Sequence, residues 1–299
     1  MPDIQLRFNR DMLVLSSPVA PVLARQGFTD AGDTEYVTLM EPEVVRDALR
    51  LNLTAGSHCL ITETAGITPA RLAHRGMADR AEELARAALA TVNDLRPQHT
   101  IVEVGPCGLP LDASSKASLN ENRDQYARAA RAVEATGQPY DAFFLNGFRN
   151  PSDLKCALMG IRQVSGKPVI ASVDVAADGT LAGGHFTFAE ALEVMAEFEA
   201  DVAGFSTAAG QEAACALAAQ AAATPLPVLA QLSVAEVNQR QGAATPENPY
   251  YCADVVVDAA LALHRAGVQF LRATGAATPA YAGALAVAVD GRDVTGRAE

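Results

Sequence analysis

The stretch that decides the fold is Val268–Pro279, "VQFLRATGAATP". Its first half, "VQFLRAT", contains apolar, β-branched and aromatic residues, which predict a strand over 268–274. The Thr-Gly-Ala-Ala-Thr-Pro segment predicts a tight loop, and the alanine-rich "PAYAGALAVAV" that starts at Pro279 predicts a helix. Strand, loop and helix therefore follow one another within about two dozen residues, in the order of a βα unit.

The same order recurs along the whole chain. Apolar runs predict eight strands, over 12–16, 58–63, 100–105, 141–146, 168–174, 201–206, 227–233 and 268–274. Amphipathic runs between them predict helices over 42–53, 79–95, 121–136, 153–163, 188–199, 210–222 and 254–265. Strands that are apolar on both faces indicate a parallel sheet covered by helices.

Eight βα units in 299 residues predict an α/β fold, a (β/α)₈ TIM barrel that forms a single domain over residues 1–299. The alternative is an open, doubly wound sheet. The chain lacks a GxGxxG segment after an early strand, which disfavours the dinucleotide-binding version of that alternative.

Charge and cysteine content limit the classes of partner. The net charge of −12, without a basic block, disfavours nucleic acid and anionic membrane surfaces as partners. No apolar run is long enough to cross a bilayer, and the N-terminal sequence lacks the pattern of a signal peptide. The five cysteines are scattered and odd in number, which is typical of reduced thiols, so we expect a cytoplasmic protein.

A TIM barrel carries its chemistry at the carboxyl ends of the strands. Glu63, at the end of the second strand, is a candidate general base or substrate anchor, and His185, after a glycine-rich turn, a candidate acid or base. Each also has a structural interpretation, an internal ion pair with Arg272 for Glu63 and an ordinary hydrogen bond for His185. The remaining strand ends supply the candidate substrate-binding residues Ser16, Ser17, Asn146, Asp174, Gln231 and Arg272.

Several segments resemble the homocysteine S-methyltransferase family in order and spacing. They are "AGSHCLITETAGIT" (55–68), "EVGPCGLPL" (103–111), "DGTLAGG" (178–184) and "TGAATP" (274–279). The resemblance extends from about Leu13 to Ala284 and implies the same barrel.

The family activates its thiol substrate with a zinc ion held by three cysteines, one after strand six and an adjacent pair after strand eight. At the corresponding positions this chain has Thr207, Thr274 and Gly275. A threonine hydroxyl does not ionise near neutral pH and is a poor zinc ligand. We therefore predict that the family zinc site is lost and that no metal is bound.

Two acids that the resemblance implies for holding the amino-acid end of homocysteine are also replaced. Ser16 and Ser17 follow strand one, and Asn146 follows strand four, where the family has an acid. We therefore expect homocysteine to bind weakly. Glu63 and Arg272 are charges that the family commonly lacks, and we expect them to flank strand one and bind a ligand between them.

The leading hypothesis is a methyltransferase-like enzyme that moves a methyl or other one-carbon group to or from a small polar substrate without the family zinc. The chain has no donor-binding motif of its own, so the methyl donor is unknown; a corrinoid or folate carried by a partner protein is one source. The sequence also leaves open whether the protein forms a homo-oligomer. The alternatives are a non-catalytic or small-molecule-binding homologue, and a barrel lyase or hydrolase that uses Glu63 and His185.

Overall fold

The computed structural model describes residues 3–28 and 33–294. Its eight strands are all paired in parallel, in the order β1-β8-β7-β6-β5-β4-β3-β2. They are β1 (Leu13–Val14), β2 (Cys59–Ile61), β3 (His99–Val104), β4 (Ala142–Phe148), β5 (Val169–Asp174), β6 (Val202–Thr207), β7 (Val228–Val234) and β8 (Val268–Gly275).

The sheet closes between β1 and β2. Leu15 forms an isolated parallel bridge with Cys59, and the Ser16 amide donates to the Cys59 carbonyl at 2.9 Å. The TIM barrel and all eight predicted strands are therefore confirmed, with every strand end within two residues of the prediction.

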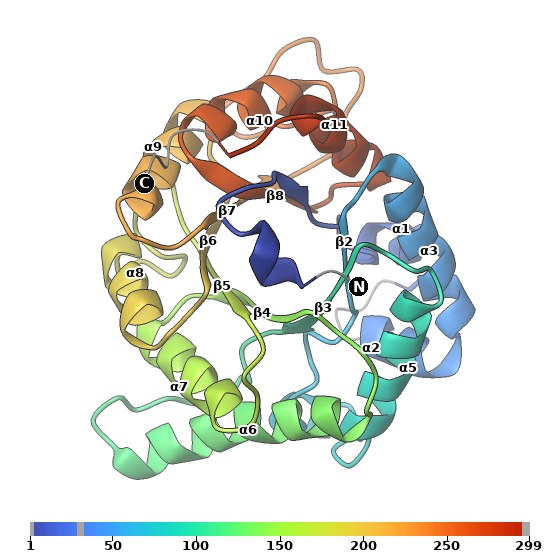
Figure 1. Cartoon of the computed structure of the whole chain (residues 1–299), viewed down its shortest axis with the longest axis vertical. Coiled ribbons are helices and arrows are strands. Elements are labelled where there is room, and N and C mark those ends of the chain that lie inside the picture. The colour runs from blue at the N-terminus through green and yellow to red at the C-terminus, as the bar shows by residue number, and fades with distance from the viewer. Residues whose placement is uncertain (1–2, 29–32, 295–299) are drawn as a thin grey trace.

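Helices surround the barrel (Figure 1). Those predicted from the sequence are α3 (Pro42–Ala55), α5 (Ala81–Asn93), α6 (Lys116–Ala135), α7 (Pro151–Arg162), α8 (Phe188–Glu197), α9 (Gln211–Ala222), α10 (Val255–Arg265) and α11 (Pro279–Val289). The structure adds short helices that the sequence analysis left as loops: η1 (Ile4–Arg7), α1 (Ala20–Ala24), α2 (Asp33–Met40) and α4 (Pro69–Ala73). Within residues 3–28 and 33–294, no helix is both long and apolar enough to cross a membrane.

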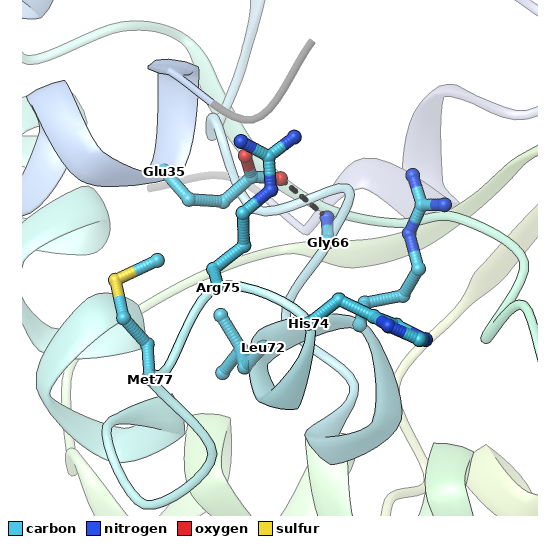
Figure 2. A pocket seen from close by; sticks show the side chains of 7 residues that line it. Glu35, Gly66, Leu72, His74, Arg75 and Met77 are labelled. Atoms are coloured by element: carbon cyan, nitrogen blue, oxygen red, sulfur yellow. Dashed lines mark hydrogen bonds between the residues drawn. The ribbon is translucent and has the colours of Figure 1, made fainter. Parts of the chain in front are cut away.

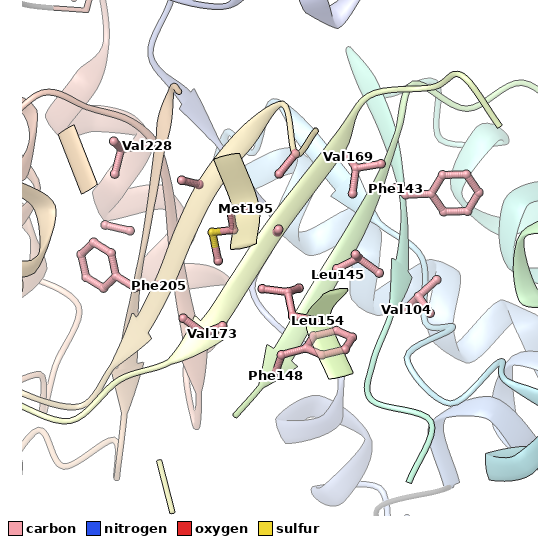
Figure 3. Close-up of a cluster of buried hydrophobic side chains, with 14 of the residues drawn as sticks. Val104, Phe143, Leu145, Phe148, Leu154, Val169, Val173, Met195, Phe205 and Val228 are labelled. Carbon is pink, nitrogen blue, oxygen red and sulfur yellow. The ribbon is translucent and has the colours of Figure 1, made fainter. Parts of the chain in front are cut away.

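Side chains alternate between the two faces of each strand, as the pleat requires. One set points outward and packs against the helices, as Figure 3 shows for Leu145 of β4 beside Leu154 of α7. The other set fills the barrel and forms a separate apolar cluster that includes Ile61, Ile101, Phe144, Ile170, Leu229 and Phe270.

The amino end of the barrel is covered by η1. Ile4 is fully buried in the interior cluster, and the Phe8 ring meets Phe270 edge-on with centroids 5.8 Å apart. Gln269 at the start of β8 donates from Nε2 to the carbonyls of Arg7 and Asp11 at 2.7 and 2.9 Å. In Figure 1 this N-terminal segment, in dark blue, lies across the middle of the strand ring. The carboxyl ends of the strands are thus the open side of the barrel.

Candidate functional site

Four polar side chains form a layer directly above the apolar interior, at the carboxyl ends of the strands. Arg272 of β8, Gln231 of β7, Asn146 of β4 and Glu103 of β3 each lie two positions after a residue of the interior cluster. Because strand side chains repeat with a period of two, all four point into the barrel. We call these four residues the polar ring.

The polar ring is joined by hydrogen bonds. Arg272 Nη1 donates to Gln231 Oε1 at 3.1 Å, and Gln231 Nε2 donates to Asn146 Oδ1 at 2.8 Å. Asn146 Nδ2 donates to Glu103 Oε1 at 2.6 Å, and the same oxygen lies 3.8 Å from Arg272 Nη1. Gln231 also donates to Ser172 Oγ of β5 at 2.8 Å. The ring therefore fixes the orientation of one cation, one anion and two amides.

Arg272 lies deeper than a residue at the rim of the mouth, since only 3% of it is exposed. Its Nε donates to the Ser16 carbonyl at 3.0 Å, and its guanidinium carbon lies 5.5 Å from the centre of the Phe144 ring. The sequence analysis left a direct pair with Glu63 open. In the described residues the acid that pairs with Arg272 is instead Glu103.

Glu63 lies beside the ring, two positions after Ile61 of β2, and is partly exposed. Burial, and after it the nearby charge of Glu103, raises the pKa of its carboxyl group from 4.5 to about 8. The Arg272 charge and a hydrogen bond from the Val19 amide act against this rise. Glu63 is therefore a carboxyl group able to exchange a proton near neutral pH.

Glu103 was not among the residues expected from the sequence. The analysis looked at the last residues of each strand, whereas Glu103 precedes the end of β3 by one position. The sequence held a signal, because Glu103 is an acid inside the apolar run "TIVEVG" (100–105) that predicts the third strand. Carboxylates are almost never buried without a partner.

The remaining predicted site residues are not members of the polar ring. Ser16 and Ser17 are buried, with Ser16 Oγ accepting from the Ile61 amide at 3.0 Å. Asp174 forms an ion pair with Arg149 at 2.9 Å. His185 is exposed in the loop between β5 and α8, and none of the hydrogen bonds among the described residues links it to the polar ring.

The residues at the family's zinc positions do not fit a zinc ion. Thr207 is buried and its hydroxyl accepts from the Ala209 amide at 3.2 Å, while Thr274 offers a second hydroxyl. Gly275 has φ +67°, and a Cβ atom built there would lie 2.5 Å from the Val234 carbonyl oxygen. In residues 3–28 and 33–294 no group of three or more His, Cys, Asp or Glu is arranged to hold a metal ion. We therefore assign no step of the chemistry to a metal.

Comparison with solved structures gives the same fold. The homocysteine methyltransferase MmuM from Escherichia coli matches in its oxidised form with a TM-score of 0.76 at 18% identity, over 93% of this chain and 96% of that chain. Its metallated form matches over the same shares with a TM-score of 0.75. The carboxyl transferase domain of Rhizobium etli pyruvate carboxylase matches with a TM-score of 0.50 at 12% identity, over 90% of this chain and 41% of that one.

Comparison of the sequence with known proteins gives a match to a family model. Among curated proteins no match is found. Residues 15–276, which contain strands β2 to β8 in full, match the homocysteine S-methyltransferase family model. The chain therefore belongs to the homocysteine S-methyltransferase family.

Proposed function

We propose that this protein transfers a methyl or other one-carbon group to or from a small polar substrate at the mouth of the barrel, without a three-cysteine zinc centre. Family membership supports methyl transfer, with a thiol as the first acceptor to consider. The observation that carries the proposal is the polar ring, in which buried Arg272 and Glu103 are fixed at the end of the barrel where TIM-barrel enzymes bind substrate.

The transfer would use Glu63 as the proton acceptor. A lone pair of the acceptor atom forms the new bond to the methyl carbon, and the bond from that carbon to the donor breaks with its electron pair remaining on the donor. The proton of the acceptor moves to a Glu63 carboxylate oxygen. A carboxyl group whose pKa is about 8 is suited to this role, because it accepts a proton from a thiol more readily than an ordinary glutamate does.

The proposal also limits which acceptor and which methyl donor the protein can use. Without a metal to form a thiolate, the acceptor has to be acidic enough for Glu63, or already ionised. Homocysteine would bind weakly, because buried Ser16 and hydrogen-bonded Asn146 offer neutral partners where the family has acids. The donor would be a corrinoid or folate brought by a partner protein, and the reaction would take place in the cytoplasm, where thiols stay reduced.

The proposal is tested by mass spectrometry of the product formed from a panel of small thiols, including homocysteine, with methylcobalamin or methyltetrahydrofolate as donor. We expect a methylated product whose rate rises with pH towards about 8, as Glu63 ionises. Glu63→Gln should lower the rate by about 10²-fold or more. Glu193→Gln, at an exposed position of α8, is the matched control and should leave the rate unchanged.

Two results would contradict the proposal. One is the absence of a methylated product from every acceptor in the panel. The other is a Glu63→Gln variant as fast as the wild type. Bond cleavage of a substrate without methyl transfer, lost in both Glu63→Gln and His185→Gln, would support the lyase or hydrolase alternative instead.

One observation favours a second candidate, a homologue that binds a small molecule without catalysis. The members of the polar ring satisfy one another, since Arg272 bonds to Gln231 and Ser16 and faces Glu103. Calorimetry that detects tight binding of a thiol or amino acid, with no product from any donor, would support this candidate.

A further inference from the structure

A cavity lies beside the loop that follows β2 and carries Glu63. It has a volume of about 200 Å³. The residues that line it belong to α2, to the loop after β2, and to α4 with the turn that follows, and are Glu35, Gly66, Arg71, Leu72, His74, Arg75 and Met77. This volume is several times the ~30 Å³ share of one water molecule and is below the ~300 Å³ of a typical drug-sized pocket. It suits a small metabolite.

The cavity is cationic in a strongly acidic protein. Arg71 and Arg75 are four positions apart, one helical turn, and His74 lies between them in the sequence. All three are exposed, and in the described residues their side chains make neither a hydrogen bond nor an ion pair. The chain as a whole has a net charge of −12, so unpaired arginines gathered around one cavity are not explained by its general composition.

One acid faces these arginines and is already held. Glu35 is 9% exposed, and its Oε1 accepts a hydrogen bond from the Gly66 amide at 2.7 Å, drawn as a dashed line in Figure 2. A Cβ atom at Gly66 would lie 2.4 Å from this oxygen, so the hydrogen bond needs glycine at this position. In Figure 2 the Glu35 and Arg75 side chains converge on one end of the cavity.

The charges of Arg71 and Arg75 lower the pKa of Glu35, although burial raises it by more. The two guanidinium groups are therefore within electrostatic reach of Glu35. One carboxylate leaves an excess of positive charge in the cavity. Leu72 and Met77 are buried and supply an apolar floor.

We propose that this cavity is a binding site for a small anion, with a carboxylate or phosphate group on Arg71 and Arg75 and a short apolar part against Leu72 and Met77. Guanidinium groups bind both anions through paired hydrogen bonds. The site is separate from the polar ring and does not depend on the proposed function. The loop from Glu63, which lies beside the polar ring, to Gly66, which lines the cavity, connects the two sites.

The proposal is tested by isothermal titration calorimetry of the full chain with two probes, inorganic phosphate and butyrate. Saturable binding of either probe to one site per chain is expected, and the tighter probe identifies the class of anion. Arg71→Gln and Arg75→Gln should each weaken that binding at least about ten-fold, which corresponds to about 1.4 kcal/mol.

Two further variants make the test specific. Glu35→Gln keeps an acceptor for the Gly66 amide but removes the negative charge, so it should tighten anion binding. Arg50→Gln removes an exposed arginine of α3 that is paired with Asp47, and should leave the affinity unchanged. Melting temperatures of all four variants near that of the wild type would show that the fold is retained.

The proposal is overturned if neither probe binds saturably at millimolar concentration. It is also overturned if Arg50→Gln weakens binding as much as Arg75→Gln, because the interaction would then reflect surface charge in general. Saturable anion binding by a wild-type protein that forms no methylated product would instead count against the proposed function alone.

Discussion

At the scale of single residues, Arg272 shows how a cation can be buried at low cost. Its guanidinium has a carbonyl, an amide oxygen and a carboxylate as partners, from Ser16, Gln231 and Glu103. A buried charge with such partners is tolerated, whereas a buried charge that loses its partner is strongly unfavourable.

We therefore expect Arg272→Ala to lower the free energy of unfolding, by up to about 3–5 kcal/mol, because Glu103 would keep its charge without a cation. Urea denaturation at pH 7 measures this. Adding Glu103→Gln should restore part of the loss, since glutamine still accepts the hydrogen bond from Asn146 without a charge. A double variant less stable than Arg272→Ala would show that the pair does not set the stability.

Glu63 gives the protein a pH dependence of known sign. Its pKa is about 8 in the folded protein and 4.5 as the ordinary value, so the folded state holds the proton more tightly. Stability from this group is complete below pH 4.5 and falls as pH rises to about 8. We expect Glu63→Gln to flatten this fall in a series of melting temperatures from pH 5 to pH 8.5, relative to the wild type. Parallel curves for the two proteins would contradict the raised pKa.

At the scale of elements, the backbone at the end of β8 restricts which side chains can be introduced at the family's zinc positions. Gly275 has a positive φ and lies against the β7 backbone, where a Cβ atom would meet the Val234 carbonyl oxygen at 2.5 Å. Thr274, directly before it, is only partly buried and has no such restriction on its backbone.

We expect Gly275→Cys to lower the free energy of unfolding by about 1–3 kcal/mol, through backbone strain and the clash with β7. Thr274→Cys is the control and should change it by less than about 0.5 kcal/mol. The triple variant with cysteine at positions 207, 274 and 275 should not gain stoichiometric zinc, and neither should the wild type, as elemental mass spectrometry of the purified proteins can check. One zinc ion per wild-type chain would contradict the predicted loss of the zinc site.

The short helices that the sequence analysis missed also belong to this scale. α1 and α4 have five residues each and α2 has eight, which is too few turns for a helical periodicity to stand out. Their formation depends on tertiary packing rather than on local propensity. Two of them, α2 and α4, supply walls of the proposed anion cavity.

At the scale of the whole molecule, the barrel is closed at one end by the N-terminal segment. Ile4 enters the interior cluster from outside the sheet, together with Phe8 against Phe270. This closure leaves the carboxyl ends of the strands as the accessible end of the barrel, where the polar ring lies.

We expect Ile4→Ala to lower the free energy of unfolding by about 2–4 kcal/mol, because it leaves a cavity in the interior cluster. Leu6→Ala, in the same short helix but 67% exposed, should change it by less than about 0.5 kcal/mol. Chemical denaturation of the two variants compares them directly. Equal losses would show that η1 does not support the barrel.

The sequence by itself determined the barrel. Alternating apolar runs and amphipathic runs predicted eight strands and the long helices, because burial on both faces and helical periodicity are local patterns. The same reasoning placed Glu63, Asn146, Gln231 and Arg272 at strand ends. The strand order of a closed barrel also placed Glu63 and Arg272 on either side of strand one, but it did not show which side chains touch.

Only the tertiary structure decided the partners. Arg272 could pair with Glu63 or bind a ligand as far as the sequence showed, and the closed barrel instead brings it to Glu103, 169 positions earlier in the chain. The inward register of β3, together with the tilt of a closed barrel, sets which side chains meet across the interior. The pKa of Glu63 has the same origin, because burial and the charge of Glu103 both depend on that closure.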